Sequence, residues 1–201
     1  MFFWSRFFGR ASAAEPAALS RFLGRQAAYV TQKTVVDYCR VKAGRGEAEL
    51  FGNPDFMAAL RHCRWQVYFA SLADVSAMAE AWLRPHAPGR EPLLADAIAA
   101  LGRAVLDAED VPPDEQSARD AARESLAAHL AALLAAPPVP ADRMALTAEA
   151  PLFATLPVHP EQRRGESEAI RGALRFQIVT TQQELERGFD APRLAARLLA
   201  P

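Results

Sequence analysis

The sequence has little cysteine, little glycine and almost no net charge. Its 201 residues include 2 cysteines and 10 glycines, and the formal net charge is −1 at pH 7. Two cysteines are too few for a disulfide-stabilised scaffold, and so little glycine excludes a collagen-like repeat. No apolar run approaches the roughly 18 residues of a membrane-spanning helix. A nearly neutral chain is also a poor electrostatic partner for nucleic acid, so we expect no nucleic-acid partner.

The composition that remains is that of a globular protein. Hydrophobic residues make up 51% of the chain and charged residues 23%, which supplies enough apolar surface for a buried core. The charge is uneven, however: residues 1–70 hold ten basic and five acidic residues, whereas residues 71–160 hold six basic and thirteen acidic ones. This asymmetry indicates either a face that contacts a partner or an ordinary difference between helix surfaces.

Apolar residues recur with helical spacing along most of the chain, and strand-like alternation is rare. We therefore predict an all-α fold, a single-domain bundle of five or six helices. Residues 1–14 form an aromatic amphipathic arm in this interpretation, and residues 15–201 form one helical domain. The expected helices cover residues 16–43, 53–84, 92–108, 114–135 and 167–187, with a short terminal helix after residue 190.

The helix expected from Asn53 to Arg84 is the best candidate for the centre of the bundle. Asn53 is a good N-cap, Pro54 suits the first helical position, and Asp55 suits the positive end of the helix. From Val67 onward the segment is apolar on nearly all sides, which is typical of a buried helix. By contrast, residues 137–165 read as an irregular connector, with a short helix over 143–150 and an extended segment over 152–158.

The first ten residues are unusually aromatic for a chain of this composition. At helical spacing most of the aromatic side chains fall on one arc, flanked by arginines. Such a face is typical of an interfacial membrane anchor or of a helix that docks in a partner's groove, although it could also fold back onto the chain's own core. The residues expected to make this contact are Phe2, Phe3, Trp4, Arg6, Phe7, Phe8 and Arg10.

No catalytic or metal motif is complete. The segment from Gly165 to Ala169 resembles the GxSxG turn that presents a nucleophilic serine, but no strand precedes it and no histidine follows it. We therefore predict that Ser167 is a helix N-cap. The four histidines lack metal-ligand spacing, so we expect no metal and no cofactor. Cys39 and Cys63 are expected to be buried thiols in a reduced compartment, although a disulfide between them is an alternative.

Polar residues on the first two long helices form the second candidate site. Asp74 interrupts the most apolar helix, and Lys33 and Asp37 lie four residues apart on the first helix. With Arg64 or Tyr68 they could form a polar pocket inside the bundle. The alternative is that they are partly exposed ion pairs that join two helices.

Two short segments resemble a known family. The runs from Ala27 to Lys33 and from Val67 to Asp74 are similar to those of small helical bacterial proteins of unknown function, some of which carry an esterase label. The resemblance covers roughly residues 20–80. It implies that Lys33 and Asp74 are positions of interest.

These observations lead to two functional hypotheses. The first is a non-enzymatic interaction or accessory protein that docks through its aromatic arm on a protein partner, such as a membrane protein complex, or weakly on the membrane surface. Such a protein would be cytoplasmic and peripheral at the inner face of the membrane. The alternative is a small-molecule-binding bundle or a hydrolase with a polar pocket between the first two long helices.

Overall fold

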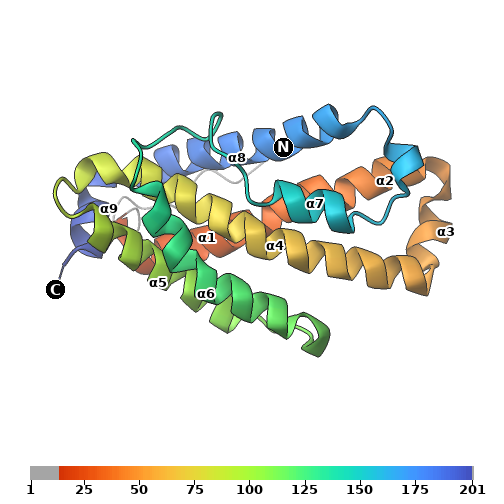
Figure 1. Cartoon of the computed structure of the whole chain (residues 1–201), viewed down its shortest axis with the longest axis horizontal. Coiled ribbons are helices and arrows are strands. Elements are labelled where there is room, and N and C mark those ends of the chain that lie inside the picture. Colours follow the sequence, from red (N-terminus) through yellow and green to blue (C-terminus); the bar gives the residue numbers. More distant parts are fainter. Residues whose placement is uncertain (1–13, 201) are drawn as a thin grey trace, which may run out of the picture.

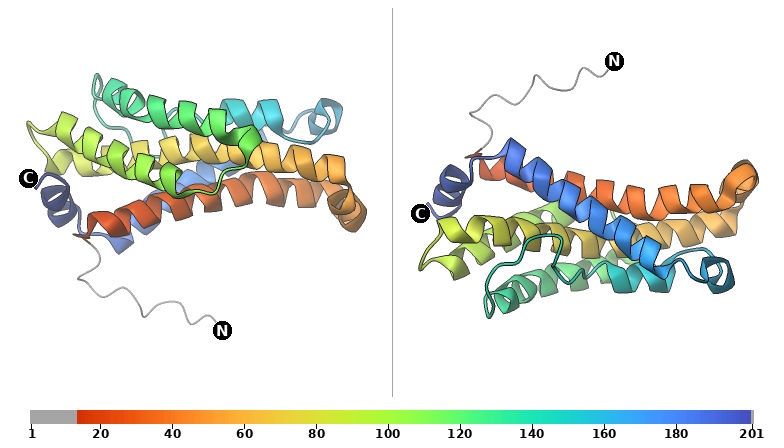
Figure 2. Two further views of the ribbon diagram at one scale, coloured as in Figure 1. Left: turned by 90° about the horizontal axis from the view of Figure 1, so that it is seen from below. Right: turned by 90° about the horizontal axis from the view of Figure 1, so that it is seen from above.

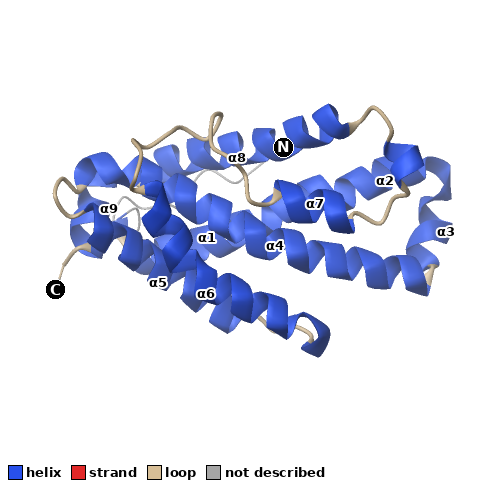
Figure 3. Ribbon diagram, in the orientation of Figure 1, coloured by secondary structure: helices blue, strands red, loops and turns tan. Residues whose placement is uncertain are grey.

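The computed structural model describes residues 14–200 and shows an elongated bundle of helices (Figure 1). No strand occurs in this part of the chain (Figure 3), which confirms the predicted all-α fold. In chain order the helices are α1 (Pro16–Thr31), α2 (Asp37–Ala43), α3 (Glu47–Gly52), α4 (Pro54–Leu83), α5 (Glu91–Ala108), α6 (Gln116–Leu133), α7 (Glu149–Thr155), α8 (Ser167–Gly188) and α9 (Ala191–Leu198).

Helix α4 is the centre of the bundle, as predicted. Its N-cap is Asn53, whose side chain accepts hydrogen bonds from the backbone N–H groups of Asp55 (2.9 Å) and Phe56 (3.1 Å). Because α4 is apolar on nearly all sides from Val67 onward, it can be covered by several helices at once. Helices α1, α5, α6, α7 and α8 all pack against it, and α9 lies across one end of the bundle (Figure 2).

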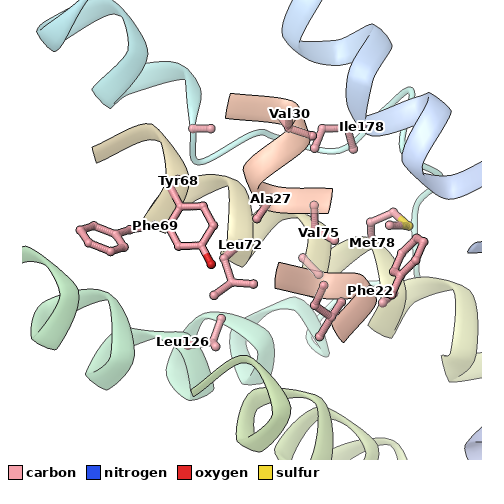
Figure 4. Close-up of a cluster of buried hydrophobic side chains, with 14 of the residues drawn as sticks. Phe22, Ala27, Val30, Tyr68, Phe69, Leu72, Val75, Met78, Leu126 and Ile178 are labelled. Carbon is pink, nitrogen blue, oxygen red and sulfur yellow. The ribbon is translucent and has the colours of Figure 1, made fainter. Parts of the chain in front are cut away.

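The core is built where these helices meet α4. Phe22 and Ala27 of α1, Leu72 of α4, Leu126 of α6 and Ile178 of α8 are all buried (Figure 4). Helices α5 and α6 form a pair joined by the segment 109–115, which runs back over α4. Acidic side chains of this segment therefore lie against the N-terminal half of α4.

The first helix continues to Ala43, as predicted, but it is not regular. Five residues, Gln32–Val36, form a π-helical turn between α1 and α2. The hydroxyl groups of Thr31 and Thr34 donate to the carbonyl oxygens of Ala27 (2.9 Å) and Val30 (2.8 Å). Such back-bonding competes with the regular helix ladder, which is one way in which a helix accommodates a bulge. The sequence pattern did not predict this interruption.

The structure corrects the prediction for residues 137–165. Residues 152–158 were expected to be extended and residues 143–150 helical, yet the helix of this region is α7, Glu149–Thr155. Pro151 fits because the first turn of a helix needs no N–H donor there. The start of α7 is fixed from a distance: the Asp74 carboxylate accepts hydrogen bonds from the N–H groups of Thr147 (2.7 Å) and Ala148 (3.0 Å).

Two helix starts also differ from the predictions. Ser167 is the first helical residue of α8 rather than its cap, and the preceding Glu166 makes no capping bond. Asp114 lies in a 3-10 turn, and α6 begins two residues later at Gln116. In both cases the acidic residue at the helix start is engaged by another helix instead: Glu166 by Tyr38 of α2 and Asp114 by Arg61 of α4.

Candidate functional site

A cavity of about 220 Å³ lies between α1, α4 and the residue that follows α5. It contains two residues of the predicted polar cluster, Arg64 and Tyr68. The residues that line it are Ala28, Thr31, Arg61, Arg64, Trp65, Tyr68 and Glu109. The cavity therefore lies between the first two long helices and has an aromatic wall and three charged side chains.

Helix α4 supplies most of the lining because of the spacing of its residues. Arg61, Arg64, Trp65 and Tyr68 are three or four positions apart, which places them on one face over two turns. The Trp65 ring stacks on Phe69, with ring centroids 5.6 Å apart, and meets the Tyr68 ring edge to face at 5.8 Å. This packing holds the aromatic wall in a fixed position.

Tyr68 contributes a buried hydroxyl to the lining of the cavity. Tyr68 is buried, and its hydroxyl donates a hydrogen bond to Glu109 Oε1 at 2.6 Å. Burial and then the Glu109 carboxylate raise the pKa of Tyr68 well above its usual range. The phenol therefore stays protonated and acts as a donor at any physiological pH.

Glu109 lines one side of the cavity, and the segment 109–115 that begins there is attached to α4. Besides the Tyr68–Glu109 bond, Asp114 pairs with Arg61 of α4 (3.2 Å). The buried Glu115 accepts from Gln66 Nε2 (2.8 Å) and lies 2.6 Å from Nδ1 of His62. Three acidic side chains thus attach this segment to α4, and one of them neutralises the charge of Arg61.

Arg64 differs from Arg61 because no carboxylate of the described residues pairs with it. Within residues 14–200 its guanidinium makes no hydrogen bond and no ion pair, and the side chain is exposed at the mouth of the cavity. A guanidinium carries five donors that suit a planar anion. Arg64 is therefore the cation of this site that is available to a ligand.

The other residues of the predicted cluster lie elsewhere. Lys33 and Asp37 form an ion pair of 2.9 Å on the surface of the π-helical turn and α2. Asp74 is fully buried and contacts the connector before α7, with Thr147 donating through both its N–H and its hydroxyl. The structure thus brings together Arg64 and Tyr68 and separates them from Lys33, Asp37 and Asp74.

Asp74 has a structural role, because its carboxylate binds backbone N–H groups before α7. Burial raises its pKa to about 6, and the hydrogen bonds from Thr147 and Ala148 oppose this shift without cancelling it. No lining residue of the cavity is among its partners. Asp74 holds the connector against α4.

No family model, curated protein or solved structure matches this chain. The resemblance to small helical bacterial proteins consequently stays a prediction. No helix of the described residues is both long enough and apolar enough to cross a membrane. In the same part of the chain, no group of three or more His, Cys, Asp or Glu side chains is placed to hold a metal ion.

The other candidate residues from the sequence are the two cysteines, Ser167 and the residues of the arm. Cys39 and Cys63 are free and buried, as predicted, and burial raises the thiol pKa to about 12 and about 11. Ser167 follows a loop that contains Gly165 at φ +80°, and no strand precedes it in the described part of the chain. The seven aromatic and basic residues of the predicted arm lie outside the described residues.

Sequence reasoning missed three charged or aromatic residues of the cavity, Arg61, Trp65 and Glu109. The helical spacing from Tyr68 could have identified Arg61 and Trp65, because both fall on the same face of α4. Glu109 gave no such signal, since its contact with Tyr68 spans 41 residues and depends on the path of the chain after α5.

Proposed function

We propose that the chain is a binding protein whose cavity between α1 and α4 takes a small polar molecule. The observation that carries this proposal is Arg64, a cation without a described partner, beside the Tyr68–Glu109 pair at the mouth of a cavity. Ligand cavities for drug-sized molecules typically measure about 300–1,000 Å³. A cavity of about 220 Å³ therefore suits a smaller ligand.

Binding explains the lining better than bond cleavage does. A hydrolase needs a nucleophile beside a general base, but the seven lining residues contain no serine, cysteine or histidine. The one aliphatic hydroxyl, that of Thr31, donates to the carbonyl oxygen of Ala27 at 2.9 Å. The side chains that remain are hydrogen-bonding groups and aromatic surface, which recognise a molecule and hold it.

Saturation-transfer NMR with a library of small acids, bases, zwitterions and neutral polar compounds would test this proposal. Ala28 is exposed and lines the cavity, so Ala28→Trp is expected to fill the space and abolish binding without disturbing the core. Ala173→Trp, at an exposed position of α8, is the matched control and should bind normally. If no compound binds in a way that depends on Ala28, the proposal is wrong.

A second candidate function rests on the sequence of the arm. We propose that the aromatic face of residues 1–10 docks on a protein partner, such as a membrane protein complex, with weak contact to the membrane surface at its inner face. Four aromatic residues flanked by Arg6 and Arg10 support this proposal. It is independent of the cavity, and both functions could belong to one protein.

An affinity pull-down from gently solubilised membranes tests the arm directly. Chains that lack residues 1–10 should lose the partner and the recovery in the membrane fraction. A chain of full length with Phe3, Trp4, Phe7 and Phe8 changed to Ser separates the aromatic face from mere length. Unchanged recovery of both variants would exclude the arm as the docking element.

A further inference from the structure

On the basis of the proposed function, we propose that the ligand is a small zwitterion whose carboxylate binds Arg64 and whose ammonium binds Glu109. Free α-amino acids with a small apolar side chain are the simplest members of this class. Each end of the cavity then holds one charge of the ligand.

The cationic end of the cavity is Arg64 alone. Arg61 lies on the same face of α4, but Asp114 neutralises it at 3.2 Å. Among the described residues Arg64 has no such partner, and its planar guanidinium matches a carboxylate with two parallel hydrogen bonds. A ligand carboxylate is the group that this end recognises best.

The anionic end of the cavity is Glu109. Its Oε1 accepts from the Tyr68 hydroxyl, and its Oε2 has no donor among the described residues. A carboxylate can accept several hydrogen bonds, so a ligand ammonium can bind there. The aromatic rings of Trp65 and Tyr68 line the same space, and the face of an aromatic ring attracts a cation.

The two charges together exclude ligands with one charge. A simple anion would be attracted by Arg64 but repelled by Glu109. A simple cation would be attracted by Glu109 but repelled by Arg64. Arg64 and Tyr68 are four residues apart on α4, so their Cβ atoms lie about 5–6 Å apart. An α-amino acid carries its ammonium and its carboxylate on the same carbon, so it presents both charges within a similarly short span.

The size of the cavity limits the rest of the ligand. Since a water molecule takes about 30 Å³ of liquid, a cavity of about 220 Å³ has room for a few non-hydrogen atoms beyond the charged groups. Ala28 supplies apolar surface in addition to that of Trp65. A short aliphatic side chain fits this remainder better than a long or charged one.

Isothermal titration calorimetry with L-valine, N-acetyl-L-valine and L-valinamide tests the assignment of charges. The acetyl group removes the ammonium, and the amide removes the carboxylate. Because a hydrogen bond to a charged group contributes about 1.5–3 kcal/mol, each derivative should bind about 10- to 100-fold more weakly than L-valine. Equal affinity of either derivative would overturn the inference.

Two variants assign each charge to a residue. Arg64→Gln should weaken L-valine by about 10- to 100-fold and strengthen L-valinamide, because it removes a like charge. Glu109→Gln should weaken L-valine similarly and strengthen N-acetyl-L-valine for the same reason. Arg187→Gln and Glu124→Gln, at exposed positions of α8 and α6, carry the same charge changes and should bind like the wild type. Circular dichroism and melting temperature establish that all four variants fold.

The outcomes separate this inference from the proposed function. If neutral or singly charged compounds occupy the cavity, as judged by the effect of Ala28→Trp, and no zwitterion from a panel of small amino acids does, the inference is overturned and the binding function stands. If no compound at all binds the cavity, both are overturned. If L-valine binds but neither Arg64→Gln nor Glu109→Gln changes its affinity, the charge assignment is wrong.

Discussion

The buried Asp74 predicts an unusual dependence of stability on pH. The pKa of an aspartate in water is 3.8, and in the folded protein burial raises the pKa of Asp74 to about 6. Between these values the folded chain binds more protons at this position than the unfolded chain does. The free energy of unfolding therefore falls as the pH rises through this range, because the ionised carboxylate is tolerated less well in the core than in water.

The size of this effect follows from the shift in pKa. A shift of about 2 units corresponds to roughly 3 kcal/mol, since one unit equals 1.36 kcal/mol. Asp74→Asn removes the titrating group but keeps an oxygen that can accept from Thr147, so the fold should survive. The loss of the acceptor for the Ala148 N–H adds a penalty of about 1 kcal/mol that does not depend on pH.

Urea unfolding followed by circular dichroism between pH 4 and pH 8 measures both contributions. The free energy of unfolding of Asp74→Asn, relative to the wild type, should rise by up to about 3 kcal/mol across this range. Asp96→Asn, at an exposed position of α5, is the control and should show no such trend. A difference that is constant with pH, or that falls as the pH rises, would refute the reasoning about burial.

Three further predictions concern stability and thiol reactivity. In the wild type a guanidinium nitrogen of Arg84 lies 2.6 Å from the buried Glu80 carboxylate. Arg84→Met leaves that carboxylate without its partner, and the free energy of unfolding in urea should fall by about 3–5 kcal/mol. Asn53→Ala removes the N-cap of α4 and should cost about 1 kcal/mol by the same measurement. A thiol reagent at pH 8 should leave Cys39 and Cys63 unmodified in the folded protein and modify both in urea, because burial raises their pKa to about 12 and about 11.

Each of these predictions has a matched check. The double change Glu80→Leu with Arg84→Met should cost less than Arg84→Met alone, and equal costs would mean that the unpaired carboxylate is not the cause. Asn53→Asp should retain most of the stability that Asn53→Ala loses. Rapid modification of either cysteine under native conditions would contradict the burial of that thiol.

Local signals in the sequence were enough to place the central helix. The Asn53 cap and its first turn use hydrogen bonds between residues two and three apart, and the apolar surface of α4 is visible in the sequence itself. Such features depend on neighbours in the chain, so their physics can be read before the fold is known. The all-α class follows from the same helical spacing.

Features that depend on distant contacts could not be predicted. The start of α7 is fixed by Asp74, 73 residues before Thr147, so nothing near Thr147 in the sequence indicates where that helix begins. Glu109 enters the cavity for a similar reason, since the return of the segment 109–115 over α4 brings it to Tyr68. The pattern that suggested a pocket with Asp74 identified a buried carboxylate correctly but could not show which face of α4 it occupies.

The π-helical turn Gln32–Val36 determines how α2, which follows it, is rotated about the helix axis. Such a turn accommodates one additional residue, and each residue of a regular helix turns the chain by about 100°. If the same residues formed a regular helix instead, the additional residue would rotate α2 by about this angle. Tyr38 and Lys42 would then turn away from Glu166, which they now contact at 2.6 Å each. The π-helical turn is therefore what keeps Tyr38 and Lys42 on the side of α2 that faces Glu166.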